Sequence, residues 1–161
     1  MKILSLDIAT HTGWAYFDGT GIAKGGTWDF SVKRDESSSM KFIRLKSELC
    51  KILDDGIDLV VYEAARHGAS HMQGALVCQA ELQAIVKNWC DENGNIPYRG
   101  YRPKEIKKFA TGNGNAKKEL MIESAKKSFN IKIIDDNHAD ALWLLALATK
   151  EYAQFDLILK K

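Results

Sequence analysis

The chain has 161 residues, of which 45% are hydrophobic and 27% are charged, and this is the composition of a globular domain that buries its own core. No apolar stretch reaches the ~20 residues of a membrane helix, and Asp7 interrupts the first apolar run too early for a signal peptide. We therefore expect a cytoplasmic protein without a membrane partner. Three cysteines without a C-x-x-C pair predict reduced thiols and make a zinc site unexpected.

The net charge of +2 conceals an uneven distribution of charge along the chain. Residues 99–132 contain ten Lys or Arg and three acids, so this segment carries +7 and the remainder carries −5. A concentration of positive charge of this kind favours a polyanionic partner. The alternative is a set of solvated helix faces.

Hydrophobic periodicity and turn residues predict a mixed α/β chain. We expect strands at Ile3–Asp7, Gly13–Phe17, Ile22–Phe30, Ile57–Tyr62 and Ile131–Ile134, and a further strand reached through the loop Gly94–Tyr101. We expect helices between Ser37 and Gly56, over Ser70–Trp89, from Pro103, over Ala116–Ser128 and over Asn137–Gln154. No repeat, low-complexity tract or linker divides the chain, so we expect a single domain over residues 1–161.

Four acidic residues fall at the ends of predicted elements. Asp7 and Glu63 end apolar strands, and Asp136 and Asp140 open the last apolar helix. Two of these residues also have a purely structural alternative. Asp7 could form a turn, and the negative charge of Asp140 near the start of a helix could be stabilised by the helix dipole. Glu63 follows five mostly apolar residues, so its carboxylate needs a cation. Carboxylate oxygens suit Mg²⁺ or Mn²⁺, and two such ions about 3.5–4 Å apart hold both reacting oxygens of a phosphodiester. The pattern therefore indicates a metal-dependent nuclease.

Several motifs occur in an order that is similar to a known family. They are Leu4–Asp7 with Thr12–Ala15, Val60–Glu63, Tyr101–Lys108 with Thr111–Glu119, and His138–Leu142. On these residues, which run through most of the chain, the sequence resembles the RuvC family of Holliday-junction resolvases, as a phage-type or divergent member. The resemblance implies an α/β, ribonuclease H-like fold with a mixed five-stranded sheet flanked by helices. It also implies the cytoplasm of a bacterial or phage-infected cell.

The resemblance further implies symmetric nicking of branched DNA, which leaves 5′-phosphate and 3′-hydroxyl ends. Two Mg²⁺ ions per active site are implied, with Mn²⁺ as a substitute. Asp7 would be shared between the ions, and Glu63, Asp136 and Asp140 would complete their shells. Family members carry two ligands at i and i+3 on the last helix, but here the residue three before Asp140 is Asn137. Asp136 lies at i−4 on the same helical face, so either Asp136 or Asn137 supplies this ligand, and we favour Asp136.

DNA contact is expected from the basic segment and from the loop after Glu63. Lys107 and Lys118 match positions where the family holds basic residues near the phosphate. The glycine-rich loop before the next helix is expected to offer backbone N–H groups to a phosphate. The full set of expected DNA-binding residues is Arg66, Arg102, Lys104, Lys107, Gly112, Asn113, Gly114, Lys117 and Lys118.

A symmetric pair of nicks requires a twofold dimer. The helix Ser70–Trp89 carries small residues at Gly74, Ala75, Ala80 and Ala84 and resembles the dimer helix of the family, although an ordinary core helix is an equal alternative. Cellular members wedge an aromatic residue into the junction. The segment between Tyr62 and Trp89 has no aromatic residue, so either His71 or Met72 substitutes or wedging is absent.

Three other functions compete with a junction nuclease as the interpretation of this sequence. A ribonuclease H acting on RNA–DNA hybrids would share the fold and the acids, but the Thr-Gly-Asn-Gly segment and the dimer helix argue against it. A non-catalytic junction-binding protein would bind without cutting, and the intact Asp7, Glu63 and Asp140 argue against this. A sugar-kinase or actin-like ATPase needs a second similar domain, for which the chain is too short.

Overall fold

The fold of the chain was obtained as a computed structural model, which describes residues 1–64 and 73–152. The strands are β1 (Ile3–Asp7), β2 (His11–Phe17), β3 (Ile22–Asp29), β4 (Leu59–Glu63) and β5 (Tyr98–Tyr101). The helices are α1 (Met40–Leu53), α2 (Gln73–Glu92), α3 (Pro103–Thr111), α4 (Lys118–Ser128) and α5 (Asp136–Glu151). Among these helices, none is both long and apolar enough to cross a membrane.

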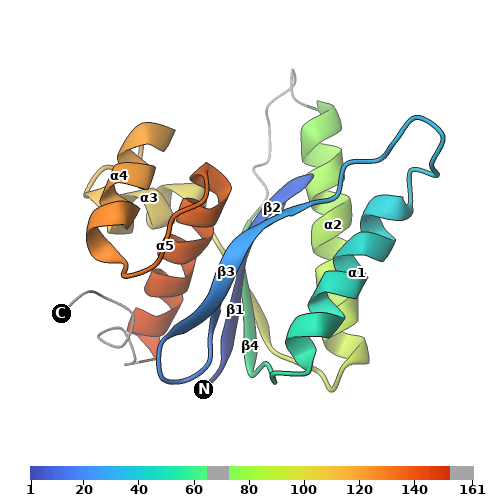
Figure 1. Cartoon of the computed structure of the whole chain (residues 1–161), viewed down its shortest axis with the longest axis horizontal. Coiled ribbons are helices and arrows are strands. Elements are labelled where there is room, and N and C mark those ends of the chain that lie inside the picture. The colour runs from blue at the N-terminus through green and yellow to red at the C-terminus, as the bar shows by residue number, and fades with distance from the viewer. Residues whose placement is uncertain (65–72, 153–161) are drawn as a thin grey trace.

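The strands form one mixed sheet in the order β3-β2-β1-β4-β5. The first three strands are an antiparallel meander, and β4 and β5 add in parallel to β1. The sheet separates two helical layers, with α1 and α2 on one face and α3, α4 and α5 on the other (Figure 1). This is the mixed five-stranded sheet with flanking helices that the resemblance implied.

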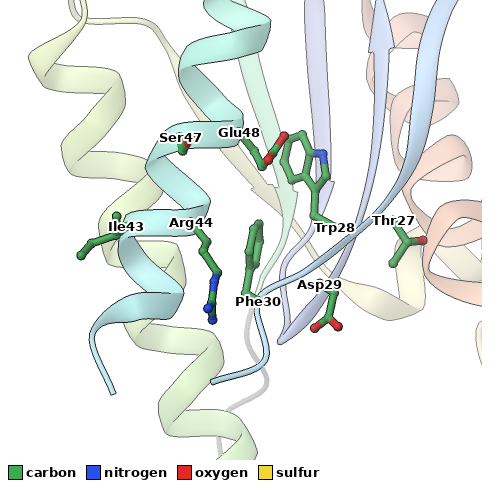
Figure 2. A pocket seen from close by; sticks show the side chains of 8 residues that line it. All are labelled: Thr27, Trp28, Asp29, Phe30, Ile43, Arg44, Ser47 and Glu48. Carbon is green, nitrogen blue, oxygen red and sulfur yellow. The ribbon is translucent and has the colours of Figure 1, made fainter. Parts of the chain in front are cut away.

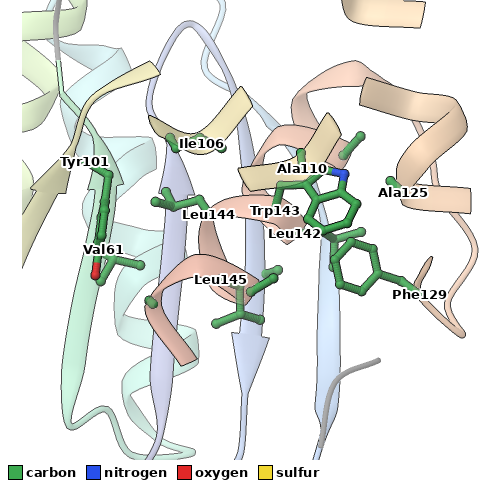
Figure 3. Packing of buried hydrophobic residues seen from close by; sticks show 14 of the residues in the cluster. Val61, Tyr101, Ile106, Ala110, Ala125, Phe129, Leu142, Trp143, Leu144 and Leu145 are labelled. Carbon is green, nitrogen blue, oxygen red and sulfur yellow. The ribbon is translucent and has the colours of Figure 1, made fainter. Parts of the chain in front are cut away.

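Strict alternation along the strands builds a core on each face of the sheet. Ile3 and Val61 face α5, whereas Leu4, Leu6 and Val60 face α1 and α2. Helix α5 is buried along most of its length because it packs across β1 and β2. Figure 3 shows Leu142, Leu144 and Leu145 of α5 in this core, with the Trp143 ring between Ala110 of α3 and Phe129 after α4.

Gly13 allows α5 to lie against the sheet. It pairs with Asp7 across the β1–β2 ladder, and a Cβ atom on Gly13 would lie 1.8 Å from the backbone oxygen of Asn137. The contact is with backbone, so no side-chain rotation relieves it. The start of α5 therefore sits directly beside Asp7 only because residue 13 has no side chain.

Replacing Gly13 with Ala is expected to destabilise the fold by more than about 3 kcal/mol, because overpacking against fixed backbone forces α5 off the sheet. Urea unfolding followed by circular dichroism measures this loss. Gly74→Ala is the matched control, since a Cβ atom there meets no heavy atom within 4 Å. Equal stability of the two variants would contradict the role assigned to Gly13.

The sequence predictions deviate from the structure in a few places. Residues 131–134 are not a strand, although Ile131 and Ile133 alternate inward and pack on the α5 core. In the described sheet, β3 and β5 are the edge strands, and residues 131–134 pair with neither. The Ile134 side chain instead lies over Gly26 of β3, 3.4 Å from the position that a Cβ atom of residue 26 would occupy. Strand β2 begins two residues earlier than expected, β4 starts at Leu59 rather than Ile57, α4 starts at Lys118 rather than Ala116, and α5 starts at Asp136 rather than Asn137.

Candidate functional site

Asp7 and Glu63 lie next to each other at the carboxyl ends of neighbouring parallel strands. The β1–β4 register pairs Leu6 with Tyr62, and each acid is the next residue along its strand. Because Ile3 and Val61 face α5 and side chains alternate, Asp7 and Glu63 point to that same face. Both side chains are partly buried.

Helix α5 brings the other two acids to this place. Its first turn carries Asp136, and Asp140 follows one turn later on the same side of the helix. The buried Ser5 hydroxyl on β1 lies 2.8 Å from the carbonyl oxygen of Ala141 and donates to it, which ties the helix to the strand that carries Asp7. Together with Gly13, this contact fixes α5 over the ends of β1 and β4.

The carboxylates influence one another electrostatically. Burial raises the pKa of Asp7 well above its ordinary value, and the negative charges of Glu63, Asp140 and Asp136 raise it further. Burial is also the main reason that the pKa of Asp140 rises to about 6, with Asp136 adding to the shift. Four acids from three separate elements therefore lie close enough for the charges of Glu63, Asp136 and Asp140 to act on Asp7.

Two lysines of the basic segment reach this centre. Lys118, at the start of α4, donates a hydrogen bond to Asp136 Oδ2, and this bond lowers the pKa of Asp136. The positive charges of Lys107 and Lys118 both oppose the rise in the pKa of Asp140. These are the two lysines that were expected near the phosphate.

The donor set fits a hard divalent cation. One carboxylate oxygen of Asp140, Oδ1, is buried and has no hydrogen-bond partner among the described residues, which is a costly state for an acid without a cation. All four acids supply oxygen, the donor that Mg²⁺ and Mn²⁺ prefer. In the described part of the chain, no three His, Cys, Asp or Glu side chains are yet arranged closely enough to hold an ion.

Asp136 and Asn137, the two alternatives for the remaining metal ligand, both lie in the first turn of α5. Asp136 and Asn137 line the same pocket beside Lys118. Asp135 is the N-cap, because its carboxylate accepts a hydrogen bond from the His138 backbone N–H at 2.9 Å. His138 itself is fully buried against Gly25 of β3, and burial lowers the pKa of its imidazole. His138 is therefore a core residue whose imidazole is held in its neutral form by burial.

The other predicted DNA-binding residues that the structure describes lie on α3, at the N-caps of α3 and α4, and in the loop between these helices. Arg102, Lys104 and Lys117 are exposed. In the loop, the N–H groups of Gly112, Asn113, Asn115 and Ala116 all donate to acceptors in α3 or in the loop itself. These N–H groups therefore stabilise the loop, and phosphate contact at Gly112, Asn113 and Gly114 has to come from the remaining groups. Arg66, His71 and Met72 lie outside the described residues.

Gln83 of α2 supports the site from the opposite face of the sheet. Its side chain is buried, and its Nε2 donates to the backbone oxygen of Glu63 at 2.8 Å. The sequence pattern did not single it out, although a glutamine between Leu82 and Val86 on an otherwise apolar helix face was an available signal.

If the site has the nuclease activity that the sequence predicts, Gln83→Leu is expected to lower the rate of DNA cleavage about tenfold, since the end of β4 loses a hydrogen bond worth roughly 1–1.5 kcal/mol and Glu63 is held less firmly. Two quantities measure the effect: the rate of DNA cleavage at saturating Mg²⁺ and the Mg²⁺ concentration that gives half of that rate. Gln83→Glu keeps an acceptor but removes the donor and should be similarly impaired. An unchanged rate and unchanged Mg²⁺ dependence in both variants would show that Gln83 only fills space.

A second pocket lies between β3 and α1, away from the acids. Its volume is about 440 Å³, and Figure 2 shows Trp28 and Phe30 on the strand side and Arg44 and Glu48 on the helix side. Arg44 already pairs with Glu36, and Glu48 accepts from Lys51. Its charged groups are thus engaged within the protein, and none of the four acids lines it.

The sheet order and the helical layers are those of the ribonuclease H-like fold. Within it, the structure is similar to Thermus thermophilus RuvC in complex with Holliday junction substrate, with a TM-score of 0.75 and 19% identity over 99% of this chain and 98% of that chain. It is also similar to a yeast mitochondrial Holliday junction resolvase, with a TM-score of 0.62 and 12% identity over 96% and 80% of the two chains. The chain therefore has the fold of RuvC.

Sequence comparison agrees over part of the chain. A segment of 54 residues is 44% identical to the crossover junction endodeoxyribonuclease RuvC of Brachyspira hyodysenteriae. The match spans 34% of this chain and 33% of that protein. No protein-family profile matches the chain. The resemblance to RuvC that the motifs indicated is thus confirmed as partial sequence homology joined to a shared fold.

Proposed function

We propose that the protein is a metal-dependent endonuclease that nicks four-way and related branched DNA junctions symmetrically, leaving 5′-phosphate and 3′-hydroxyl ends. The observation that carries the proposal is the meeting of Asp7, Glu63, Asp136 and Asp140 beside Lys107 and Lys118. Acids hold cations, and lysines attract phosphates. The similarity to RuvC supports a DNA junction as the substrate.

The residues have separate tasks in this reaction. Asp7, Glu63 and Asp140 bind the cations, with Asp136 or Asn137 as the remaining ligand. Lys118 approaches the scissile phosphate, and it must exchange its hydrogen bond to Asp136 for one to a phosphate oxygen. When two Mg²⁺ ions, or Mn²⁺ in their place, are bound, they lower the pKa of the attacking water and offset charge on the leaving 3′-oxygen. The rigid β1–β4 pair keeps the two strand acids aligned throughout.

Two copies of the chain would supply the paired nicks. The small residues Gly74, Ala80 and Ala84 of α2 are exposed on one side together with Val77, and this exposed face supports α2 as the dimer helix rather than a core helix. Ala75 lies two helical turns before Leu82 and so on the other side of α2. Leu82, Val86 and Trp89 on the other side of α2 enter the core. The proposal also treats residues 1–161 as one nuclease domain acting in the cytoplasm of a bacterial or phage-infected cell.

Cleavage of a synthetic four-way DNA junction with Mg²⁺ or Mn²⁺ tests the proposal. Paired symmetric nicks are expected in the junction, with little cleavage of a linear duplex or an RNA–DNA hybrid. Junction binding without cleavage in either metal would replace the enzyme with a junction-binding protein. Preferential cutting of the hybrid would replace it with a ribonuclease H.

A further inference from the structure

A pocket of about 340 Å³ opens beside the acid cluster. Its walls come from the turn between β1 and β2, from α2 and from the starts of α4 and α5. Lys118, Asp136 and Asn137 line the side shared with the acids. Thr10, His11, Ala75 and Cys78 line the rest. The pocket thus continues from the place where the scissile phosphate would lie.

The turn that forms one wall is fixed in place. The Thr12 hydroxyl donates to the backbone oxygen of Ala9 at 2.6 Å, and the backbone oxygen of Thr10 accepts from the Phe30 N–H at 2.8 Å. His11 Nε2 lies 3.4 Å from Asp29 Oδ1 at the end of β3. Thr10 and His11 therefore present their side chains from a rigid support, which is the arrangement that selective contacts require.

The polar groups of the pocket match the edge of a nucleobase. A hydroxyl, an imidazole and an amide, from Thr10, His11 and Asn137, provide both donors and acceptors. Ala75 and Cys78 give an apolar wall on α2, and Lys118 supplies positive charge at the mouth. Among the described residues that line the pocket, the imidazole of His11 is the only ring, so contacts to base edges outweigh stacking. Contacts of this kind discriminate between bases, whereas stacking does not.

We propose that this pocket receives an unstacked nucleotide adjoining the scissile phosphate and that His11 reads its base. Its volume is near the lower limit of the roughly 300–1,000 Å³ of small-ligand pockets, which suits one nucleotide and excludes a duplex. Removing a base from a duplex costs a few kcal/mol, and the cost is least where pairing is already interrupted. The pocket therefore favours a branch point and gives the cut a base preference. This inference rests on the proposed junction nuclease activity.

Cys78 provides a reporter inside the pocket. It is partly buried, with its sulfur 3.6 Å from Lys41 Nζ. Cys50 is exposed and is removed as Cys50→Ser, whereas Cys90 is buried, and burial raises the pKa of its thiol to about 12. In the Cys50→Ser protein, a thiol-directed reagent should therefore modify Cys78.

The experiment treats Cys50→Ser protein with methyl or benzyl methanethiosulfonate. The benzyl adduct is expected to slow junction nicking at least tenfold and the methyl adduct much less, and bound four-way junction in EDTA should protect Cys78 from labelling. The Cys50→Ser, Cys78→Ser protein, compared with its own untreated rate, should not respond. Unprotected Cys78, or nicking unaffected by the benzyl group, overturns the pocket assignment. Failure of the untreated protein to bind or nick junctions instead overturns the proposed function.

A second measurement isolates His11. Junctions randomised at the bases flanking the cut are cleaved by the wild type and by His11→Ala, and the products are sequenced. A flattened base preference at one flanking position is expected, because the base reader is removed. An equal loss of rate at all sequences would show that His11 only supports the turn and would overturn its role as a reader.

Discussion

Asp7→Asn is expected to lower junction nicking by about three orders of magnitude or more while junction binding persists. Asp7 lies at the centre of the acid cluster, and Glu63, Asp140 and Asp136 all act on its charge. An amide of the same shape keeps the packing but removes a carboxylate ligand. Loss of a cation that supplies several kcal/mol of transition-state stabilisation corresponds to this fall in rate. Single-turnover cleavage and a gel-shift assay in EDTA measure the two properties.

The same substitution is expected to stabilise the metal-free protein. Because the pKa of folded Asp7 is raised, the folded state holds a proton that the unfolded state releases, and stability falls as the pH rises through that interval. The uncharged amide of the Asp7→Asn variant carries no such penalty, so the advantage of this variant should be greatest above the raised pKa. In EDTA at pH 8, we expect a Tm higher by several degrees, at roughly 2–4 °C per kcal/mol for a chain of this size.

Three controls bear on the Asp7 prediction. At low pH the difference in Tm should shrink, because the raised pKa of Asp7 lets the folded wild type take up a proton and lose the buried charge. Added Mg²⁺ should raise the Tm of the wild type more than that of Asp7→Asn, since binding to the folded state is stabilising. A variant that nicks at the wild-type rate would remove Asp7 from the reaction, and a lower Tm in EDTA would contradict its placement among like charges.

Lys118→Met is expected to slow nicking about 10- to 100-fold. Lys118 is the lysine that donates to Asp136, and its charge also opposes the raised pKa of Asp7 and of Asp140. A charge-assisted hydrogen bond to a phosphate is worth roughly 1.5–3 kcal/mol, which gives this range. Cleavage rates at several salt concentrations separate the local contact from general attraction of DNA.

Helix α4 itself offers the matched control. Lys127 has the same side-chain exposure as Lys118, 73%, and it also pairs with an acid, Glu123, which lies away from the site. Lys127→Met should stay within about threefold of the wild type, because an exposed pair of this kind contributes little. Equal losses in the two variants would mean that Lys118 contributes only to the overall positive field.

Local patterns predicted the elements that carry the strand acids. The apolar runs that end at Asp7 and Glu63 are β1 and β4. The segment Ile131–Ile134 was wrongly predicted as a strand. Its alternation does reflect one buried side, but alternation cannot reveal whether a neighbouring strand is available to pair with it. Packing against α5 satisfies the same pattern without a sheet.

Contacts between distant residues could not be predicted from the sequence. The hydrogen bond from Lys118 to Asp136 and the pocket that joins His11 to Cys78 depend on how α2, α4 and α5 meet above the sheet. Gly13 is an example: the sequence predicted that it begins a strand, whereas the structure shows a close approach of its backbone to that of Asn137. Such approaches depend on tertiary packing, and a glycine in the sequence does not by itself indicate which backbone will approach it.

The helix that closes the acid cluster is also the last described element of the chain and the main support of one core. Asp140 follows Asp7 in the chain by some 130 residues, so it is synthesised later. A nascent or truncated chain that lacks α5 therefore has neither the complete set of acids nor the packing that aligns the remaining ones. Under the proposed function, DNA is exposed to this nuclease only once translation has passed α5, so unfinished chains pose no threat to the genome of the cell that makes them.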